Sequence, residues 1–175
     1  TAPPPTSTAS IPVTGDSNKR LQQEGVALYR QSQYQAALEK LEAALGNYQK
    51  APSPVEEGFT LIYIGRVYYG QGRYDEALKI YQQALDILRG KDRVGEGAAL
   101  NGLGEVYWAQ GHYAEALAKF KEALSILRAV DSPLEEGMTL KGLGSVYREQ
   151  SLYEEALANY QQAMAIFLEA GDDFE

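Results

Sequence analysis

The chain has 175 residues, 45% of them hydrophobic, which is enough for one compact domain or one short solenoid. Its formal net charge of −8 argues against general nucleic-acid binding, which favours a basic surface, and against attachment to an anionic membrane surface. It contains no cysteine and a single histidine, so we expect no disulfide, no metal site and no cofactor.

The opening segment, residues 1–17, is rich in Pro, Thr and Ser and shows no apolar periodicity, which predicts a disordered arm. The chain starts at Thr1 rather than at methionine. A removed export signal and a trimmed expression product both explain this start, so the sequence leaves the compartment open between cytoplasmic and exported or periplasmic. No apolar run approaches the roughly 18 residues that span a bilayer, so we expect no membrane insertion.

After the arm, the sequence repeats itself four times. Tyr34, Tyr74, Tyr113 and Tyr153 follow one another at steps of 40, 39 and 40 residues. The same steps separate a set of glycines and a set of alanines, namely Gly25, Gly65, Gly104 and Gly144, and Ala37, Ala77, Ala116 and Ala156. We therefore divide residues 18–170 into repeats of approximately 18–52, 53–91, 92–131 and 132–170. Residues 171–175 are expected to begin a linker to a further repeat or domain.

Each repeat is predicted to form two helices. The second helix is the clearer one, because its apolar residues recur at helical spacing, as from Tyr113 through Phe120 to Leu127 in the third repeat. The turns between the two helices are short, and Gly72 and Gly111 are placed to end the first helix. Connections this short predict antiparallel neighbours.

The first helices carry start signals. Ser53 and Ser132 are each followed by proline at the first helical position. A glutamate stands three residues after each serine, which predicts capping boxes. Asp92 is expected to replace the serine in the third repeat. In the first repeat Glu24 stands where the other repeats have isoleucine or leucine, and a polar residue there suits the outermost repeat of a solenoid.

Glycines inside the first helices need an explanation, because each costs roughly 1 kcal/mol relative to alanine. We expect the four periodic glycines to face the periodic alanine of the second helix, so that the two helix axes approach closely. The segment Gly102-Leu103-Gly104 is similar to part of a phosphate-binding loop, but it lacks the third glycine, a preceding strand and a helix that starts after it. Close helix packing is therefore the favoured interpretation.

The order of these residues resembles the tetratricopeptide repeat. The matching residues are Leu61, Ile64, Gly65, Tyr68, Tyr74, Ala77, Tyr81 and Ala84 in the second repeat, and Leu100, Leu103, Gly104, Tyr107, Tyr113, Ala116, Phe120 and Ala123 in the third. The long period is similar to that of kinesin light chains, cell-polarity adaptors and bacterial multi-repeat proteins. The resemblance implies an all-α fold, a right-handed α-solenoid superhelix of four antiparallel helix pairs. It also implies a non-catalytic protein-interaction scaffold.

In this family the first helices line a concave groove, and the resemblance implies that the groove binds a peptide or a partner helix. The groove residues implied here are Lys19, Gln22, Tyr29, Phe59, Ile62, Arg66, Tyr69, Asn101, Glu105, Trp108, Met138, Lys141 and Arg148. Aromatic and arginine residues are enriched at binding hot spots, and the four cations in this set face one carboxylate, which favours an acidic peptide with aromatic or aliphatic residues. Two alternatives stay open: the charge excess arises by chance, and Tyr69 and Trp108 pack against neighbouring helices instead.

Catalytic residues are not expected. His112 lies in a predicted turn, and no serine has a histidine base within the repeat pattern. The alternative function is self-assembly: Ala163 and Phe167 lie on the apolar side of the last predicted helix, where no further helix covers them, and they are the residues expected at a homodimer interface. A protein or peptide partner is expected in either case.

Overall fold

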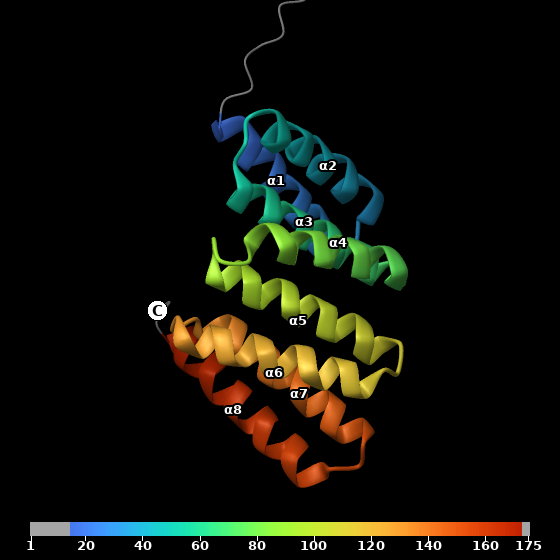
Figure 1. Cartoon of the computed structure of the whole chain (residues 1–175), viewed down its shortest axis with the longest axis vertical. Helices are drawn as coiled ribbons and strands as arrows, with labels where there is room; N and C mark the ends of the chain where they lie inside the picture. Colours follow the sequence, from blue (N-terminus) through green and yellow to red (C-terminus); the bar gives the residue numbers. More distant parts are fainter. Residues whose placement is uncertain (1–14, 173–175) are drawn as a thin grey trace, which may run out of the picture.

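The computed structural model describes residues 15–172, and over this range it contains eight α-helices stacked in four pairs (Figure 1). The helices are α1 (Gly15–Arg30), α2 (Tyr34–Lys50), α3 (Pro54–Gly70), α4 (Tyr74–Leu88), α5 (Arg93–Ala109), α6 (Tyr113–Ala129), α7 (Pro133–Glu149) and α8 (Tyr153–Asp172). The predicted all-α solenoid of four helix pairs is confirmed.

Two helix ends differ from the sequence-based boundaries. Helix α1 begins at Gly15, inside the segment 1–17 that was assigned to a disordered arm, and α8 continues to Asp172, past residue 170. The remainder of the predicted arm, and residues 173–175 of the predicted linker, lie outside the described residues.

The first helix of each pair forms an inner layer. Each helix packs against the next one along the chain, and α1, α3, α5 and α7 also pack against one another in sequence. Within residues 15–172 no comparable contacts join the second helices α2, α4, α6 and α8. Because the inner helices touch and the outer ones do not, the stack curves toward its inner layer, which places the side chains of α1, α3, α5 and α7 on the concave side.

The N-terminal caps correct part of the prediction. The side chains of Ser53 and Ser132 donate or accept no hydrogen bond at the backbone of their helices, and the Ser132 hydroxyl donates to Oε2 of Glu135 at 2.7 Å instead. The capping boxes predicted at these serines are therefore wrong. Their ψ angles of 78° and 79° fall short of the extended 111° at Asp92, whose Oδ1 does accept from the Gly95 backbone N–H at 2.7 Å. The cap predicted at Asp92 is confirmed.

The turns inside the pairs follow the sequence prediction. After α3 and α5 the chain passes through Gly72 and Gly111, whose φ angles of +73° and +78° lie in the left-handed region that glycine adopts without steric cost. Ser32 and Ser151 take the same place in the outer two pairs, with φ angles of 59° and 62°.

Three of the four periodic glycines, Gly65, Gly104 and Gly144, face an aromatic ring rather than the periodic alanine, whereas Gly25 faces Leu41 and the Ala37 carbonyl. A Cβ atom placed on Gly65 would lie 2.7 Å from Cε1 of Tyr81, and one on Gly104 would lie 2.7 Å from Cε1 of Phe120. The prediction that these glycines face alanine is therefore corrected. The residue one helical turn after the alanine reaches back over the glycine and fills the space that a side chain would occupy.

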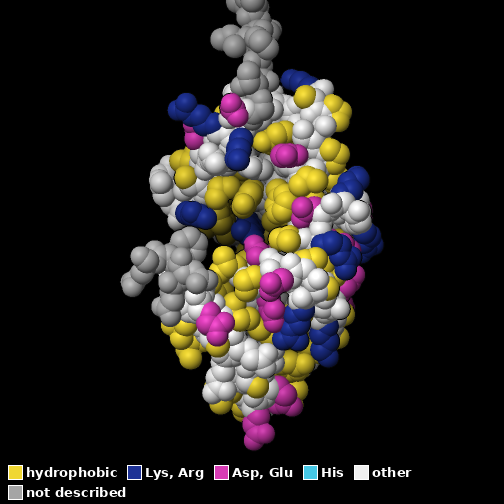
Figure 2. Space-filling model, turned by 90° about the vertical axis from the view of Figure 1, so that its left-hand side faces the viewer, with side chains coloured by type: hydrophobic (Ala, Val, Ile, Leu, Met, Phe, Trp, Pro, Cys, Tyr) yellow, Lys and Arg dark blue, Asp and Glu magenta, His cyan; other side chains and the backbone are white. Residues whose placement is uncertain are grey.

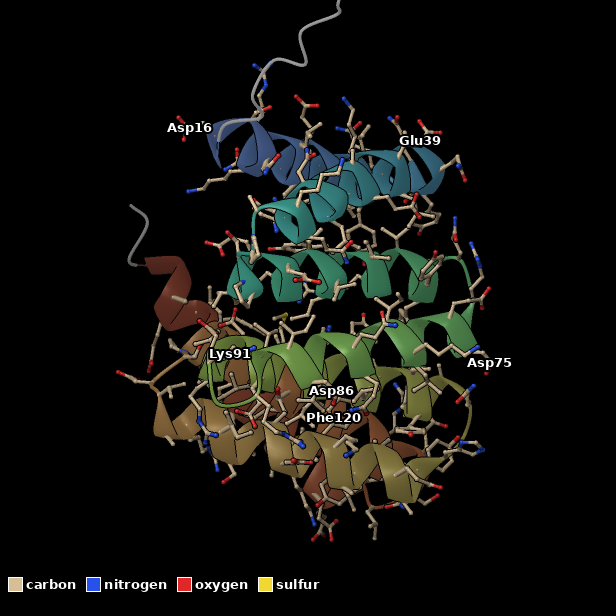
Figure 3. All side chains as sticks on the ribbon, turned by 45° about the horizontal axis from the view of Figure 1, so that its top comes forward. Asp16, Glu39, Asp75, Asp86, Lys91 and Phe120 are labelled. Atoms are coloured by element: carbon tan, nitrogen blue, oxygen red, sulfur yellow. The ribbon has the colours of Figure 1, made fainter. Side chains whose placement is uncertain are left out.

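The same rings also contact the following pair. Gly102 of α5 lies against the ring of Tyr81, and Gly142 of α7 lies against the ring of Phe120, where an added Cβ would be 2.6 Å from Cε1. Phe120 is 1% exposed and lies inside the stack in Figure 3, whereas Asp75, also labelled there, lies at its rim. Each ring thus joins its own pair to the next one.

Candidate binding groove

The concave side carries an apolar pocket of about 340 Å³. Side chains from five helices form its walls: most come from α3, α5 and α7, Arg30 comes from the end of α1, and Phe167 comes from α8. Figure 2 shows hydrophobic side chains gathered in a hollow on this face, with basic and acidic side chains next to them. The residues that line the apolar pocket are Arg30, Phe59, Ile62, Tyr63, Arg66, Ala98, Leu134, Glu135, Met138 and Phe167.

A second pocket of about 280 Å³, here called the tryptophan pocket, lies further along α3, α5 and α7. Its residues are Tyr69, Glu105, Trp108, Phe120, Lys141, Gly142 and Ser145. Arg66 lies one helical turn before Tyr69 on α3 and lines the apolar pocket, so the two pockets follow each other along the inner helices. An extended segment lying along the groove would contact both.

Glu105 is the central charge of the groove. Burial raises the pKa of its carboxyl, and the nearby Arg66 and Lys141, together with the Asn101 side-chain amide, act in the opposite direction. The Asn101 Nδ2 donates to Glu105 Oε1 at 3.5 Å. Burial, and secondarily the charge of Glu105, raise the pKa of the Tyr69 hydroxyl to about 12, so this phenol stays protonated at neutral pH.

Three buried polar atoms around Glu105 have no hydrogen-bond partner within the described part of the chain: Asn101 Oδ1, Tyr81 Oη and Trp108 Nε1. Asn101 lies about one helical turn before Glu105 and two turns before Trp108, on the same face of α5. An unpaired buried polar group costs about 1–3 kcal/mol, so the folded chain bears a cost at this part of α5.

The structure places most of the predicted groove residues in pockets. Phe59, Ile62, Arg66 and Met138 line the apolar pocket, and Tyr69, Glu105, Trp108 and Lys141 line the tryptophan pocket. Gln22 lines a smaller depression beside α1, and its Nε2 donates to Thr60 Oγ1 at 2.8 Å. Tyr69 and Trp108 also pack against the core, as the alternative interpretation expected, and their role in binding stays a prediction.

Four predicted groove residues stand apart from the two pockets. Tyr29 is partly buried against Tyr34, with ring centroids 6.2 Å apart, and Asn101 is 7% exposed. Lys19 is exposed, and Arg148 donates through Nη2 to Glu149 Oε1 at 2.8 Å. Because the carboxylate of Glu149 offsets the charge of Arg148, Arg148 does not add to the positive charge predicted for the groove.

The charge excess of the groove is accordingly smaller than the sequence suggested. Across both pockets the cations are Arg30, Arg66 and Lys141, and they face the carboxylates of Glu105 and Glu135. The groove therefore combines a large apolar surface with a modest positive balance, and apolar contacts weigh more in it than the sequence analysis expected.

Sequence reasoning missed three large apolar residues of the apolar pocket, Tyr63, Leu134 and Phe167, and Phe120 of the tryptophan pocket. Phe167 occupies the position that holds Leu127 in the preceding repeat, where the side chain lies against Gly97. The ring of Phe167 likewise lies against Gly137, and its larger size carries it into the apolar pocket. Phenylalanine is larger than the leucine at position 127, and this difference in size was the signal available in the sequence.

The two residues expected at a homodimer interface differ in exposure. Ala163 is 3% exposed and belongs to the core between α7 and α8, so its side chain is not available to a partner. Phe167 lines the apolar pocket and is 38% exposed, and its place in a dimer interface stays a prediction. The other exposed large apolar side chains of α8 are Tyr153, Leu157, Met164 and Leu168.

The part of the chain that the structure describes holds no cluster of three or more histidine, aspartate or glutamate side chains suited to a metal ion. His112 is exposed at the start of α6. Among residues 15–172, no helix is both long and apolar enough to cross a membrane.

Family models for the tetratricopeptide repeat match residues 20–89, 56–129 and 138–170. The chain belongs to the tetratricopeptide repeat family. The matches cover all four helix pairs of this tetratricopeptide repeat protein, which confirms the family proposed from its periodic residues. None of the curated protein sequences matches the chain.

Solved structures show the same fold. The Rap conjugation gene regulator of plasmid pLS20, in complex with the Phr* peptide, is 27% identical with a TM-score of 0.81, covering 94% of this chain and 46% of the regulator. BtubC from P. vanneervenii is 18% identical with a TM-score of 0.71, covering 89% and 65%. Kinesin-light-chain repeats from Podospora anserina are 18% identical with a TM-score of 0.67, covering 94% and 81%. The chain thus spans about half the length of the Rap regulator and about two thirds of BtubC.

Membership of this repeat family supports the coarse function inferred from the sequence, a protein-interaction scaffold.

Proposed function

We propose that the concave groove binds an extended peptide segment that places one apolar side chain in the apolar pocket and one carboxylate near Arg66 and Lys141. The observation that carries the proposal is the pair of neighbouring pockets along α3, α5 and α7, with Arg66 and Lys141 in their walls. Trp108, whose Nε1 has no hydrogen-bond partner among the described residues, lines the second of these pockets.

The chemistry of the walls sets the preferred ligand. Phe59, Met138 and Phe167 give the apolar pocket an aliphatic and aromatic lining, so a leucine or phenylalanine side chain fits it. Arg66 and Lys141 lie on either side of Glu105 and attract an acidic residue. The peptide-bound Rap regulator, which has the same fold at 27% identity, supports a peptide as the kind of ligand.

Binding can be followed through Trp108, the single tryptophan of the chain. We expect nine-residue peptides that alternate Leu or Phe with Asp or Glu to change its fluorescence saturably, and peptides with Lys in place of the acidic residues to bind several-fold more weakly. Substituting Lys141→Gln should weaken the acidic peptides several-fold, and Glu105→Gln should tighten them, because the groove becomes more or less positive accordingly.

Lys79→Gln is the matched control, since Lys79 is an exposed lysine on the outer helix α4. It should leave binding unchanged. If no peptide of either charge class perturbs Trp108 at millimolar concentration, or if Lys141→Gln and Lys79→Gln behave alike, the groove proposal fails.

Self-assembly through α8 and the expected lack of nucleic-acid binding both stay predictions. The polar outer face of α1 and the apolar outer face of α8 are not complementary, so head-to-tail stacking of copies has little support. Sedimentation of the chain at several concentrations would decide whether it forms dimers.

A further inference from the structure

Helix α5 carries two glutamates, Glu96 and Glu105, that differ in their partners. Glu96 is 5% exposed, and its carboxylate oxygens lie 3.6 Å from Nε of Arg89 and 3.1 Å from Nη1 of Arg93. Glu105 lines the tryptophan pocket and forms no ion pair with any residue from 15 to 172. The hydrogen bond to its side chain within this range comes from Asn101 Nδ2, at 3.5 Å. The fold thus gives ion partners to one of these carboxylates and not to the other.

The repeat places Glu105 between cations of the two neighbouring inner helices. Arg66, Glu105 and Ser145 each directly follow a periodic glycine, so they occupy equivalent positions on α3, α5 and α7, which pack side by side. Lys141 lies one helical turn before Ser145 and lines the tryptophan pocket together with Glu105. In the described part of the chain, neither Arg66 nor Lys141 forms an ion pair with a carboxylate. Both cations are therefore available to a carboxylate of a ligand.

The other groups around Glu105 are aromatic. Burial, and secondarily the charge of Glu105, raise the pKa of the hydroxyls of Tyr69 on α3 and Tyr81 on α4, so both stay protonated at neutral pH. Glu105 acts in the same direction on the pKa of Tyr29 on α1, and α6 contributes the ring of Phe120. Among the residues that the structure describes, the charged groups facing this carboxyl are thus the two cations from α3 and α7.

A ligand carboxylate in the tryptophan pocket lies beside the carboxyl of Glu105, because a pocket of about 280 Å³ leaves little room to separate them. Two ionised carboxylates at short range repel each other, and such a pair therefore tends to hold one proton in common. The rings of Tyr69, Trp108 and Phe120 line the pocket and strengthen the repulsion, because they make the surroundings less polar. The pocket consequently favours an acidic ligand residue that arrives with a proton.

Burial prepares Glu105 for this step. It raises the pKa of the Glu105 carboxyl in the free protein, against the opposing effects of Arg66, Lys141 and Asn101. A carboxylate bound beside it raises that pKa further. The complex then holds the proton more tightly than the free protein does. By linkage, the affinity for an acidic ligand increases as the pH falls from the higher pKa of the complex to the lower pKa of the free protein.

We propose that the groove binds an acidic side chain of its peptide ligand together with one proton, which comes from solvent and is shared between the ligand carboxylate and Glu105. The proton returns to solvent when the peptide leaves. This inference rests on the proposed function and adds that Glu105 sets the charge preference of the groove. Acidic peptides bind more tightly as the pH falls, whereas lysine peptides bind less tightly, because a cation favours the ionised form of Glu105.

The test uses the acidic and the lysine nine-residue peptides of the groove experiment, both without histidine. Between about pH 8 and about pH 5.5 the carboxylates of the peptide itself stay ionised. Over this range we expect the Kd of the acidic peptide, followed through Trp108 fluorescence, to fall by roughly threefold or more, and that of the lysine peptide to rise. Calorimetry of the acidic peptide in PIPES and in imidazole, buffers of different ionisation enthalpy, should show net proton uptake on binding.

Glu105→Gln isolates the residue. Glutamine is neutral at every pH, and its amide donates to a carboxylate as a protonated glutamic acid does. We expect the variant to bind the acidic peptide with one Kd at every pH, equal to the wild-type Kd at the lowest pH, and without proton uptake. Glu115→Gln is the matched control, since Glu115 is an exposed glutamate in the first turn of α6, and it should keep the wild-type pH dependence.

The possible failures are distinguishable. Binding of the acidic peptide with a constant Kd and no proton uptake would overturn this inference and leave the groove proposal standing. Proton uptake that persists in Glu105→Gln would also overturn it, because the proton would then reside elsewhere. If neither peptide binds at any pH, the groove proposal fails and this inference fails with it. The calorimetry of the wild-type protein needs no variant, so the test does not depend on the folding of Glu105→Gln.

Discussion

At the scale of single residues, the buried aromatic rings decide which glycines are required. Phe120 is confined between Gly104 and Gly142, so its ring cannot move away from a methyl group added at either position. Tyr160 has the same contact on Gly144, but no second glycine lies against its ring among the described residues, and its other described restraint is a hydrogen bond of 3.2 Å between its hydroxyl and that of Ser145. Gly104 and Gly144 occupy equivalent positions in their repeats, but we expect a side chain to cost more stability at Gly104 than at Gly144.

We expect Gly104→Ala to destabilise the chain by about 1–3 kcal/mol from overpacking, which exceeds the roughly 1 kcal/mol that alanine gains in helix propensity. Gly144→Ala should cost less, because the Tyr160 ring can shift outward. Chemical denaturation followed by circular dichroism measures both.

Gly46→Ala is the control for this comparison. No heavy atom lies within 4 Å of a Cβ placed on Gly46 in α2, so the propensity gain is unopposed and the variant should be stabilised. Equal effects of the substitutions at Gly104 and Gly46 would show that the ring contact does not determine stability.

At the scale of elements, the caps show that a shared sequence pattern does not ensure a shared hydrogen bond. Asp92 pairs its carboxylate with the Gly95 backbone N–H, whereas Ser53 makes no such bond at the start of α3. The N-termini of the first helices are therefore stabilised in different ways. A side-chain cap stabilises α5, whereas proline and acidic residues in the first turn stabilise α3 and α7.

Asp92→Ala should cost about 1 kcal/mol, the usual loss for an N-cap side chain, and should lower the thermal midpoint. Ser53→Ala should change the midpoint little, because no cap bond is lost. Differential scanning calorimetry of the two variants is the measurement, and equal losses would mean that the Ser53 side chain caps α3 in solution.

At the scale of the whole molecule, stability is distributed along the stack. Each inner pair contacts a pair on both sides, whereas the α1/α2 pair and the α7/α8 pair each have one neighbour among the described helices. In a solenoid the stability is approximately the sum of the repeats and of the interfaces between neighbours, so the ends open more readily than the middle.

Amide hydrogen exchange should therefore show the strongest protection in α3–α6 and the weakest in α8, whose outer face is uncovered. Exchange detected by mass spectrometry on proteolytic fragments resolves the pairs. Uniform protection from α1 to α8 would contradict this gradient and would mean that the whole chain opens as one cooperative unit.

Sequence alone determined the period, the eight helices, the left-handed glycine turns and the polar character of the first pair, because these depend on local spacing and backbone conformation. The resemblance to the tetratricopeptide repeat implied that Phe59, Arg66, Tyr69 and Trp108 lie on the concave side, and the helical period then keeps them on one face of their helices.

Only the tertiary structure decided which neighbour meets each face. It showed that an aromatic ring rather than an alanine covers Gly104, that Ala163 is buried, and that Phe167 and Leu134 complete the apolar pocket. These contacts join residues on different pairs, and they depend on the angle at which one pair stacks on the next. That angle results from the packing of all side chains at the interface, so the local pattern of one helix does not contain it.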